Sequence, residues 1–196
     1  MGTIKKFFRI LYAASVCIVV LSAATGAAYV TGNLPEKVRL EEIEKVIHVP
    51  EPELSVDQLI EEVSPAYGVP PIVLRAVIAR ESAGKKDAIR YEPGQLARAA
   101  KISSNPEQQR MLASSHGYAQ IMGWWAPHFN ITWADLYDPR TNLEVACSIL
   151  RKGLDRRKGM GKAAALRGAL EEYNGSKVYA DAVMRQIGES LIDRTL

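Results

Sequence analysis

The chain has 196 residues, of which 47% are hydrophobic and 24% are charged, and its net charge is +3. This composition is typical of a globular protein, and the length favours one domain. The small positive charge falls well short of the basic footprint of a nucleic-acid-binding protein, so we expect no nucleic acid among its partners. Cys17 and Cys147 are far apart in the sequence and no His/Cys cluster has metal-ligand spacing. We therefore expect no disulfide between them, no metal site and no cofactor.

The N-terminal part contains an uncharged, apolar run from Ile10 to Val30. It is long enough to span a bilayer as a helix. Three basic residues precede it: Lys5, Lys6 and Arg9. Their charge predicts that the N-terminus stays in the cytoplasm and that the rest of the chain is exported. Small residues at 22–24 and 26–28 also fit a cleavable signal peptide. We expect residues 1–31 to be a signal anchor in the inner membrane or a signal peptide, with the remainder in the periplasm in either case.

Residues 32–54 are expected to form a linker, because they combine a glycine and prolines with alternating charges. Ser55 then opens a helix, with Gln58 in the position of a capping box. The next helix begins at Pro70-Pro71, where proline is tolerated. It continues from Ile72 to Glu81 and is apolar nearly all round, which predicts the central buried helix of the domain.

Further helices are predicted downstream over four segments: Pro106–Ala113, Asn142–Leu154, Ala163–Tyr173 and Lys177–Ile192. Thr132 is expected to cap a short helix that reaches Leu136. No segment shows a clear two-residue period, so no strand is predicted. The sequence therefore indicates a mainly α class, with a single domain over residues 55–196.

Glu81 ends the apolar helix and continues its buried face. Leu74, Val77 and Ile78 lie seven, four and three positions earlier, on the same side of the helix. Burial and the negative end of the helix dipole both raise the pKa of a carboxyl at this position. A carboxyl that keeps its proton near neutral pH can serve as a general acid. A helix-end glutamate whose head reaches water is the alternative, and this pattern alone favours that alternative.

Three short motifs occur in order along the chain, and two further stretches accompany them. The motifs are Glu81-Ser82, Gly117-Tyr118-Ala119-Gln120-Ile121-Met122 and Glu172-Tyr173-Asn174-Gly175, and the stretches are residues 67–70 and 138–143. Each motif is weak by itself, but the ordered set is specific. It resembles the soluble lytic transglycosylase (SLT) family, whose members are lysozyme-like enzymes that cleave peptidoglycan. The resemblance extends from about Ser55 to about Ile187.

The resemblance implies a fold like that of goose-type lysozyme and a lytic transglycosylase activity on peptidoglycan glycan strands. Such an enzyme cleaves the β-1,4 bond between N-acetylmuramic acid and N-acetylglucosamine and leaves a 1,6-anhydro end. In this family's pattern Glu81 would be the sole catalytic acid and base, and Ser82 would orient it.

The resemblance also implies roles for four residues of the cleft. Gln120 would bind the sugar, and Gly117 would let the backbone pass close to the substrate. Tyr173 would steady the Glu81 carboxyl, and Asn174 would hold the substrate.

The chain departs from the family's commonest pattern in three places. Tyr118-Ala119 stands where a Leu-Met pair is usual, and Gly175 follows Asn174 directly. The segment between Ser82 and Gly117 is longer than in compact members, and it contains a second acidic residue, Glu92.

Glu92 is the candidate second carboxylate near the site, and Asp87 and Asp135 are further candidates. A hydrolase needs such a second group, whereas a lytic transglycosylase does not. The alternatives therefore remain a lytic transglycosylase, a muramidase that hydrolyses the same bond, and a non-catalytic glycan-binding assembly factor. Wall turnover, secretion or conjugation machinery, and phage entry or lysis are all compatible biological settings.

The remaining polar and aromatic features are expected to be structural. Trp124 and Trp125 are adjacent, so their rings should point differently and at least one should lie in the core. His116 has no nucleophile partner for a catalytic triad. The basic run from Arg151 to Lys158 is expected to be a solvated face.

Overall fold

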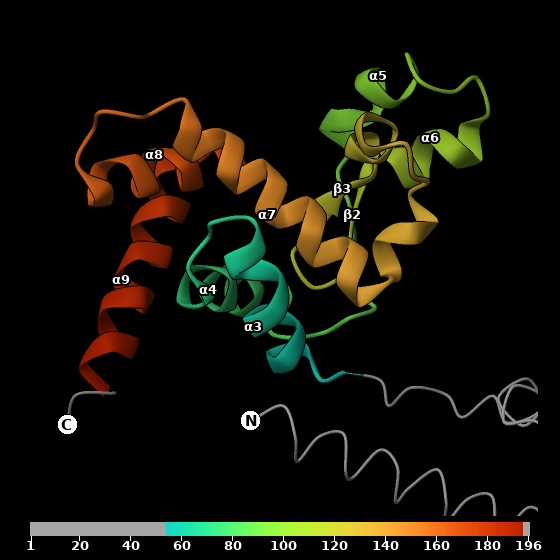
Figure 1. Ribbon diagram of the computed structural model, residues 1–196. Helices are drawn as coiled ribbons and strands as arrows, with labels where there is room; N and C mark the ends of the chain where they lie inside the picture. The colour runs from blue at the N-terminus through green and yellow to red at the C-terminus, as the bar shows by residue number, and fades with distance from the viewer. Residues whose placement is uncertain (1–53, 194–196) are drawn as a thin grey trace, which may run out of the picture. The chain divides into compact units, whose positions relative to one another are not determined.

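The computed structural model describes residues 54–193 (Figure 1). Most of this part is helical and surrounds one main hydrophobic core, which confirms the mainly α class. Within these residues, no helix combines the length and the apolar composition needed to cross a bilayer. The expected signal or anchor segment, residues 1–31, lies outside the described residues.

Helices α3 (Val56–Ala66) and α4 (Pro71–Glu81) open the described part. The Ser55 hydroxyl accepts a 3.3 Å hydrogen bond from the Gln58 backbone, and the Gln58 side chain accepts a 2.9 Å bond from the Ser55 backbone. This reciprocal pair is the predicted capping box. Within α4, Leu74 is completely enclosed and most of its apolar neighbours are also buried. The prediction of a central buried helix is confirmed.

Three long helices complete the α-helical part: α7 (Pro139–Asp155), α8 (Lys162–Asn174) and α9 (Lys177–Asp193). All three were predicted, with ends that differ by at most three residues. The contacts join α7 to α3 and α8, and α9 to α4 and α8. Figure 1 shows α7 running from this helical cluster toward the strands.

The start of α7 lies three residues before the predicted one, because Asp138 caps the helix. Its carboxylate accepts a 2.8 Å hydrogen bond from the Thr141 backbone, and Pro139 occupies the first helical position.

A three-stranded antiparallel sheet lies beyond α7, in the order β1 (Ile89–Tyr91), β2 (Ser114–His116) and β3 (Ile121–Met122). In its register Arg90 pairs with Ser115, and Ser115 pairs with Met122. The prediction that the chain has no strand was wrong. Strands of two or three residues are too short to show a two-residue period.

Short helices surround the sheet: η2 (Pro93–Gln95), α5 (Leu96–Ala99), α6 (Pro106–Leu112), η3 (Gly123–Phe129) and η4 (Ala134–Tyr137). The cap predicted at Thr132 was wrong. Thr132 instead donates hydrogen bonds from its backbone and its hydroxyl to the Asp135 carboxylate, each at 2.7 Å.

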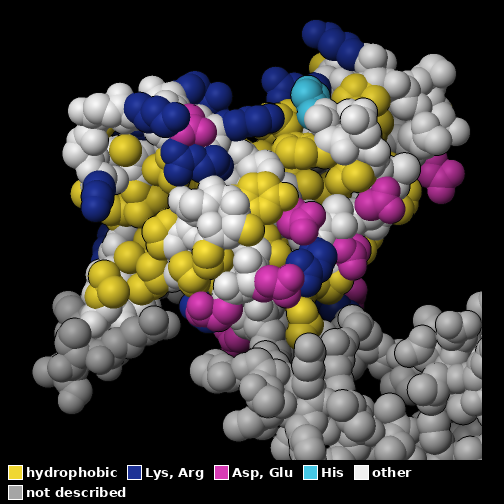
Figure 2. Space-filling model, in the orientation of Figure 1, with side chains coloured by type: hydrophobic (Ala, Val, Ile, Leu, Met, Phe, Trp, Pro, Cys, Tyr) yellow, Lys and Arg dark blue, Asp and Glu magenta, His cyan; other side chains and the backbone are white. Residues whose placement is uncertain are grey.

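The charged side chains on the face that Figure 2 shows are divided between two areas. Basic side chains gather where α7 meets α8, and acidic side chains lie over α3. In the basic area, Arg151 pairs with Asp155, and both Arg156 and Arg157 pair with Glu172. Most cations of the basic run are therefore ion-paired within the domain, although they share two carboxylates, Asp155 and Glu172.

Candidate active site

Glu81 is the last residue of α4, and most of its side chain is enclosed. Burial raises the pKa of its carboxyl above the ordinary value near 4.5, because the charged form loses solvation. Four neighbours oppose this rise by favouring the carboxylate: Tyr179, Arg90, Asn174 and Arg80. The carboxyl therefore stands in an enclosed place that also provides polar groups for its charged form.

Tyr179 lies at the start of α9 and is 7% exposed. Its hydroxyl faces the Glu81 carboxyl, and this interaction lowers the pKa of Glu81. No described residue gives this buried hydroxyl a hydrogen bond of ordinary geometry, so the contact with Glu81 is weaker than a full hydrogen bond. Burial and the Glu81 charge both hold the pKa of Tyr179 far above its usual range. Tyr179 therefore stays neutral and can act only as a donor toward a carboxylate.

Tyr173, near the end of α8, occupies a different position from the one expected. Its hydroxyl donates a 2.7 Å hydrogen bond to the backbone carbonyl of Ala119. Burial raises its pKa, and the charge of nearby Glu81 adds to the rise. The side chain thus lies near the carboxyl, but its donor is used elsewhere. The direct contact expected of Tyr173 is made instead by Tyr179, which the sequence analysis missed.

Asn174 follows Tyr173 as the last residue of α8 and is exposed. Its side chain interacts with the Glu81 carboxyl by hydrogen bonding and lowers its pKa. Gly175 then ends the helix in a left-handed conformation, at φ 82°. An exposed amide beside a largely buried carboxyl has one side toward Glu81 and one side toward solvent. The expected role in substrate binding remains compatible with this position.

Ser82 directly follows α4 as its C-cap residue and is buried. Its hydroxyl donates a 3.3 Å hydrogen bond to the Ile78 carbonyl, and its backbone N–H donates to the same oxygen at 3.1 Å. Ser82 therefore orients Glu81 by closing the helix end, and its hydroxyl hydrogen is not directed at the carboxyl. The chain then turns away through Ala83 and Gly84, both in the left-handed region at φ 52° and 76°.

Gln120 lies just before β3 with its amide fully engaged by the protein. Its Nε2 donates 3.0 Å hydrogen bonds to the carbonyls of Ala88 and Gly117, and its Oε1 accepts a 2.8 Å bond from the Ser115 hydroxyl. Both amide hydrogens are thereby used, so Gln120 holds the segment before β1 against β2. The sugar contact expected of Gln120 is not what these bonds indicate.

Gly117 is buried and has φ +74°. A Cβ at this position would lie 2.7 Å from the Leu136 carbonyl and would collide with the Asn142 side chain. Glycine is thus required here because the backbone lies too close to these two groups to leave room for a side chain. That the backbone also passes close to the substrate at Gly117 stays a prediction.

Asn142, on α7, is almost completely buried at 1% exposure. Its Nδ2 donates to the carbonyls of His116 and Leu136 at 2.9 and 2.8 Å, and its Oδ1 accepts from the Ala119 backbone at 2.8 Å. These bonds fix the loop that carries Ala119, the acceptor of Tyr173. Asn142 was part of a motif, but its function as a clamp could not be read from the motif.

Glu92 follows β1 and forms an ion pair with Arg90, with 2.6 Å between Arg90 Nε and Glu92 Oε1. Arg90 is also one of the two cations that act on Glu81. The structure thus places Glu92 near the site, joined to it through Arg90. Of the other candidate carboxylates, Asp87 is exposed, and Asp135 is exposed and bonded to Thr132.

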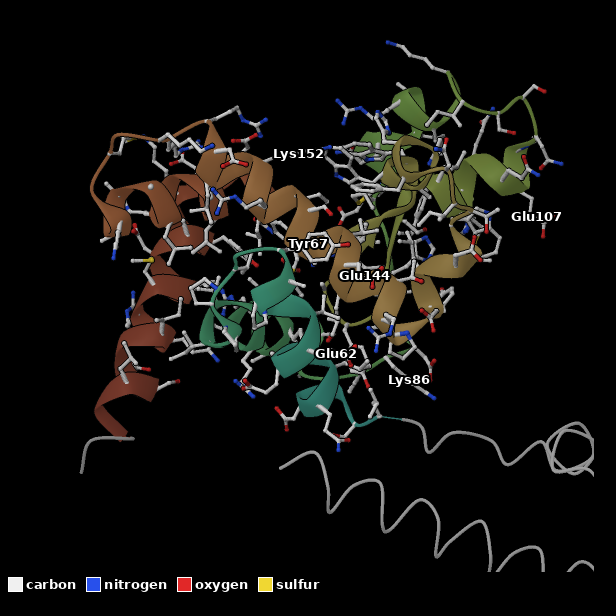
Figure 3. All side chains as sticks on the ribbon, viewed as in Figure 1. Glu62, Tyr67, Lys86, Glu107, Glu144 and Lys152 are labelled. Atoms are coloured by element: carbon white, nitrogen blue, oxygen red, sulfur yellow. The ribbon has the colours of Figure 1, made fainter. Side chains whose placement is uncertain are left out.

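His116 and the tryptophans are structural, with one difference from expectation. His116 is completely buried, and its Nδ1 and Nε2 lie 3.1 Å from the Tyr137 hydroxyl and 2.8 Å from the Met111 carbonyl. Trp124 and Trp125 stack, with centroids 4.7 Å apart, instead of pointing differently. The Arg98 guanidinium covers Trp124, and Trp125 packs partly against the core. Lys152 of α7, labelled in Figure 3, has its ammonium group 5.3 Å from the centre of the Phe129 ring, which packs against Trp125.

Within residues 54–193 no group of three or more His, Cys, Asp or Glu side chains could hold a metal ion. A scan of protein-family models matches the chain to the transglycosylase SLT domain over residues 58–189. Searches of curated proteins and of solved structures give no match. The matched segment contains the whole group of residues around Glu81, from α4 to the start of α9.

Proposed function

Because this chain belongs to the transglycosylase SLT domain family, within the lysozyme-like superfamily, we propose that it is a peptidoglycan lytic transglycosylase with Glu81 as its catalytic residue. One observation supports this assignment most strongly. Among the described acidic residues whose pKa is shifted, Glu81 alone is shifted upward. A carboxyl that retains its proton can donate it to a leaving group.

In the first step, protonated Glu81 donates its proton to the oxygen between N-acetylmuramic acid and N-acetylglucosamine. The bond from C1 of the muramic acid to that oxygen breaks, and N-acetylglucosamine leaves with a hydroxyl. Glu81 is now a carboxylate in an enclosed site, where charge is costly. Tyr179, Asn174 and the two cations near the site stabilise this form, as their effect on the pKa of Glu81 indicates.

In the second step, the C6 hydroxyl of the same muramic acid attacks C1, and the Glu81 carboxylate takes the hydroxyl proton. The new bond closes the 1,6-anhydro ring and returns Glu81 to its starting form, so no water is consumed. An internal nucleophile benefits from its proximity to C1, an advantage that a free water molecule lacks. A single carboxyl is sufficient for this cycle, because burial favours its protonated form and the polar neighbours stabilise its carboxylate form.

The positions of the other carboxylates support this reaction over hydrolysis. A hydrolase of this kind directs a second carboxylate at the sugar or at a water molecule. Glu92 is engaged by Arg90, and Asp135 is engaged by Thr132. Asp87 is exposed to solvent.

Digestion of purified peptidoglycan, followed by mass spectrometry of the muropeptides, tests the proposal. We expect 1,6-anhydro ends from the wild type and no cleavage by Glu81→Gln. Products with ordinary reducing ends would identify a muramidase. Binding to the wall without cleavage by the wild type would identify a glycan-binding assembly factor.

We further propose that the domain acts in the periplasm, either held at the inner membrane by residues 1–31 or released after their cleavage. The apolar run after a basic N-terminus supports this placement. Glycan strands are then its substrate and membrane lipid its anchor. The setting is wall remodelling or local wall opening for turnover, for secretion or conjugation machinery, or for a phage. Fractionation of cells that express the full chain, with size comparison of the mature protein, distinguishes anchoring from cleavage.

A further inference from the structure

Arg90, on β1, and Glu92, directly after it, form a pair of opposite charges, and Arg90 acts electrostatically on Glu81. They are two residues apart on an extended segment, so their side chains emerge on the same side. The 2.6 Å ion pair joins them while both side chains keep contact with solvent, at 61% and 36% exposure. A surface ion pair of this kind adds little to stability. Its position beside Glu81 suggests another use.

The backbone around this pair is held at both ends. The Ala88 carbonyl accepts hydrogen bonds from the Gly117 backbone at 2.8 Å and from the Gln120 side chain at 3.0 Å. At the other end, the Glu92 backbone donates a 2.9 Å bond to the Ala113 carbonyl. β1 is therefore fixed on β2, and the base of the Arg90 side chain has a defined position relative to the site.

The groups around Glu81 come from four elements. Arg90 reaches it from β1, Arg80 from its own helix α4, Tyr179 from α9, and Tyr173 and Asn174 from α8. Arg80 and Arg90 are the two cations among them, and both lower the pKa of Glu81. Of these two, Arg90 is the one with a carboxylate partner in a described ion pair.

We propose that the Arg90–Glu92 ion pair is a built-in electrostatic control of Glu81, in which Glu92 holds the Arg90 guanidinium and offsets part of its charge. This inference rests on the proposed role of Glu81 as acid and base. Glu92 is then a positioning residue that acts through Arg90, and it is not a second catalytic carboxylate. Without Glu92, the full charge of Arg90 would lower the pKa of Glu81. Glu81 would then lose its proton at a lower pH and could not act as a general acid over part of the pH range of the reaction.

Four variants of the full chain test the proposal through the carboxyl carbon signal of Glu81, followed by NMR as a function of pH and assigned with Glu81→Gln. Glu92→Gln should lower the pKa of Glu81, because Arg90 loses the charge that offsets it. Arg90→Gln should raise the pKa, and Arg90→Lys should leave it close to wild type. We expect each shift to be about half a pH unit, as for unit charges in a partly solvated site. Arg90→Gln combined with Glu92→Gln should raise the pKa less than Arg90→Gln alone does, because the unpaired charge of Glu92 is then absent as well.

The matched control is Glu62→Gln, which removes the same charge from another exposed ion pair. Glu62 on α3 pairs with Arg140 at 2.9 Å, and Figure 3 shows it on the face where α3 meets α7. Neither residue is among the groups that act on Glu81, so this variant should leave its titration unchanged.

Product analysis with the same proteins separates this inference from the proposed function. Glu92→Gln should still yield 1,6-anhydro ends, with the alkaline limb of its activity profile moved to lower pH. Loss of cleavage in Glu92→Gln with an unmoved Glu81 titration would overturn the inference and make Glu92 catalytic. Opposite shifts in the two single variants, with no anhydro product from the wild type, would support the electrostatic inference and contradict the proposed reaction.

Discussion

The hydroxyl of Tyr173 donates a 2.7 Å hydrogen bond to the backbone carbonyl of Ala119. This bond joins the end of α8 to the loop before β3, and Asn142 holds the same loop by accepting a hydrogen bond from the Ala119 backbone. Since Asn174 directly follows Tyr173, the bond also sets the position of an amide that faces Glu81. The two tyrosines of the site therefore have different roles: Tyr173 holds the backbone around the site in place, and Tyr179 faces the Glu81 carboxyl.

Tyr173→Phe is expected to affect stability. The Ala119 carbonyl would lose its donor inside the protein, which costs about 1 to 2 kcal/mol of the free energy of unfolding. Urea unfolding measures the change. A free energy of unfolding equal to that of the wild type would show that the bond does not support the loop.

Tyr179→Phe is expected to affect the acid–base behaviour of Glu81. The hydroxyl has no full hydrogen bond within the described residues, so its loss should change the free energy of unfolding by less than about 0.5 kcal/mol. Its interaction lowers the pKa of Glu81, so the variant should have a higher pKa and an alkaline limb of activity at higher pH. The rate should fall roughly tenfold, because the carboxylate formed in the first step loses a donor. An unchanged pH–rate profile would contradict this role.

Gly117→Ala is expected to be severely destabilising. The new methyl group would meet the Leu136 carbonyl and the Asn142 side chain, and the left-handed backbone would be strained as well. We expect a loss of about 3 kcal/mol or more in the free energy of unfolding. Gly159→Ala is the matched control, because Gly159 has φ +97° but open space around its Cβ position. It should lose only about 1 to 2 kcal/mol. Equal losses in the two variants would show that backbone conformation alone, and not the close contacts, requires Gly117.

Glu81→Gln is expected to increase stability at alkaline pH. The folded pKa of Glu81 lies above its unfolded value near 4.5, so the folded state binds the proton more tightly. The contribution of Glu81 to the free energy of unfolding is fully present below the pKa of the unfolded state. It is lost as the pH rises through the pKa of the folded state. Glutamine cannot ionise, so the variant should be more stable than the wild type at pH 8 and equally stable at pH 4.

Thermal unfolding at the two pH values measures this difference. Glu189→Gln, at an exposed glutamate on α9, is the control and should show no comparable gain. A Glu81→Gln protein that is less stable than the wild type at pH 8 would contradict the account of burial given for this carboxyl.

The sequence was sufficient to predict those structural features that depend on residues close together in the chain. The Ser55 capping box and the prolines at helix starts predicted helix beginnings, and apolar periodicity predicted the helices that form the core. Residues one and two turns earlier placed Glu81 on the buried face of its helix, and the burial of its carboxyl agrees with that position; the helix pattern alone had favoured a head that reaches water. The short strands could not be predicted, because they depend on pairing between Arg90 and Ser115, which are distant in the sequence.

The interior of the site depends on similar long-range contacts. Asn142 holds a loop more than twenty positions away, and its side chain is one of the groups that leave no room for a Cβ at Gly117. The amide of Gln120 is held by another long-range contact, with the Ala88 carbonyl. Tyr179 could have been found by position: with Val183 and Ile187 it lies on the buried face of α9. The direction of the Tyr179 hydroxyl toward Glu81 could not have been predicted, because it depends on how α9 packs on α4.

In the proposed reaction, Glu81 alone performs both steps and no water enters the product. Digestion of peptidoglycan in water labelled with heavy oxygen, followed by mass spectrometry of the muramic acid ends, tests both points together. We expect 1,6-anhydro ends without label from the wild type, and no new ends from Glu81→Gln. Labelled reducing ends from the wild type, or continued cleavage by Glu81→Gln, would contradict the proposed reaction.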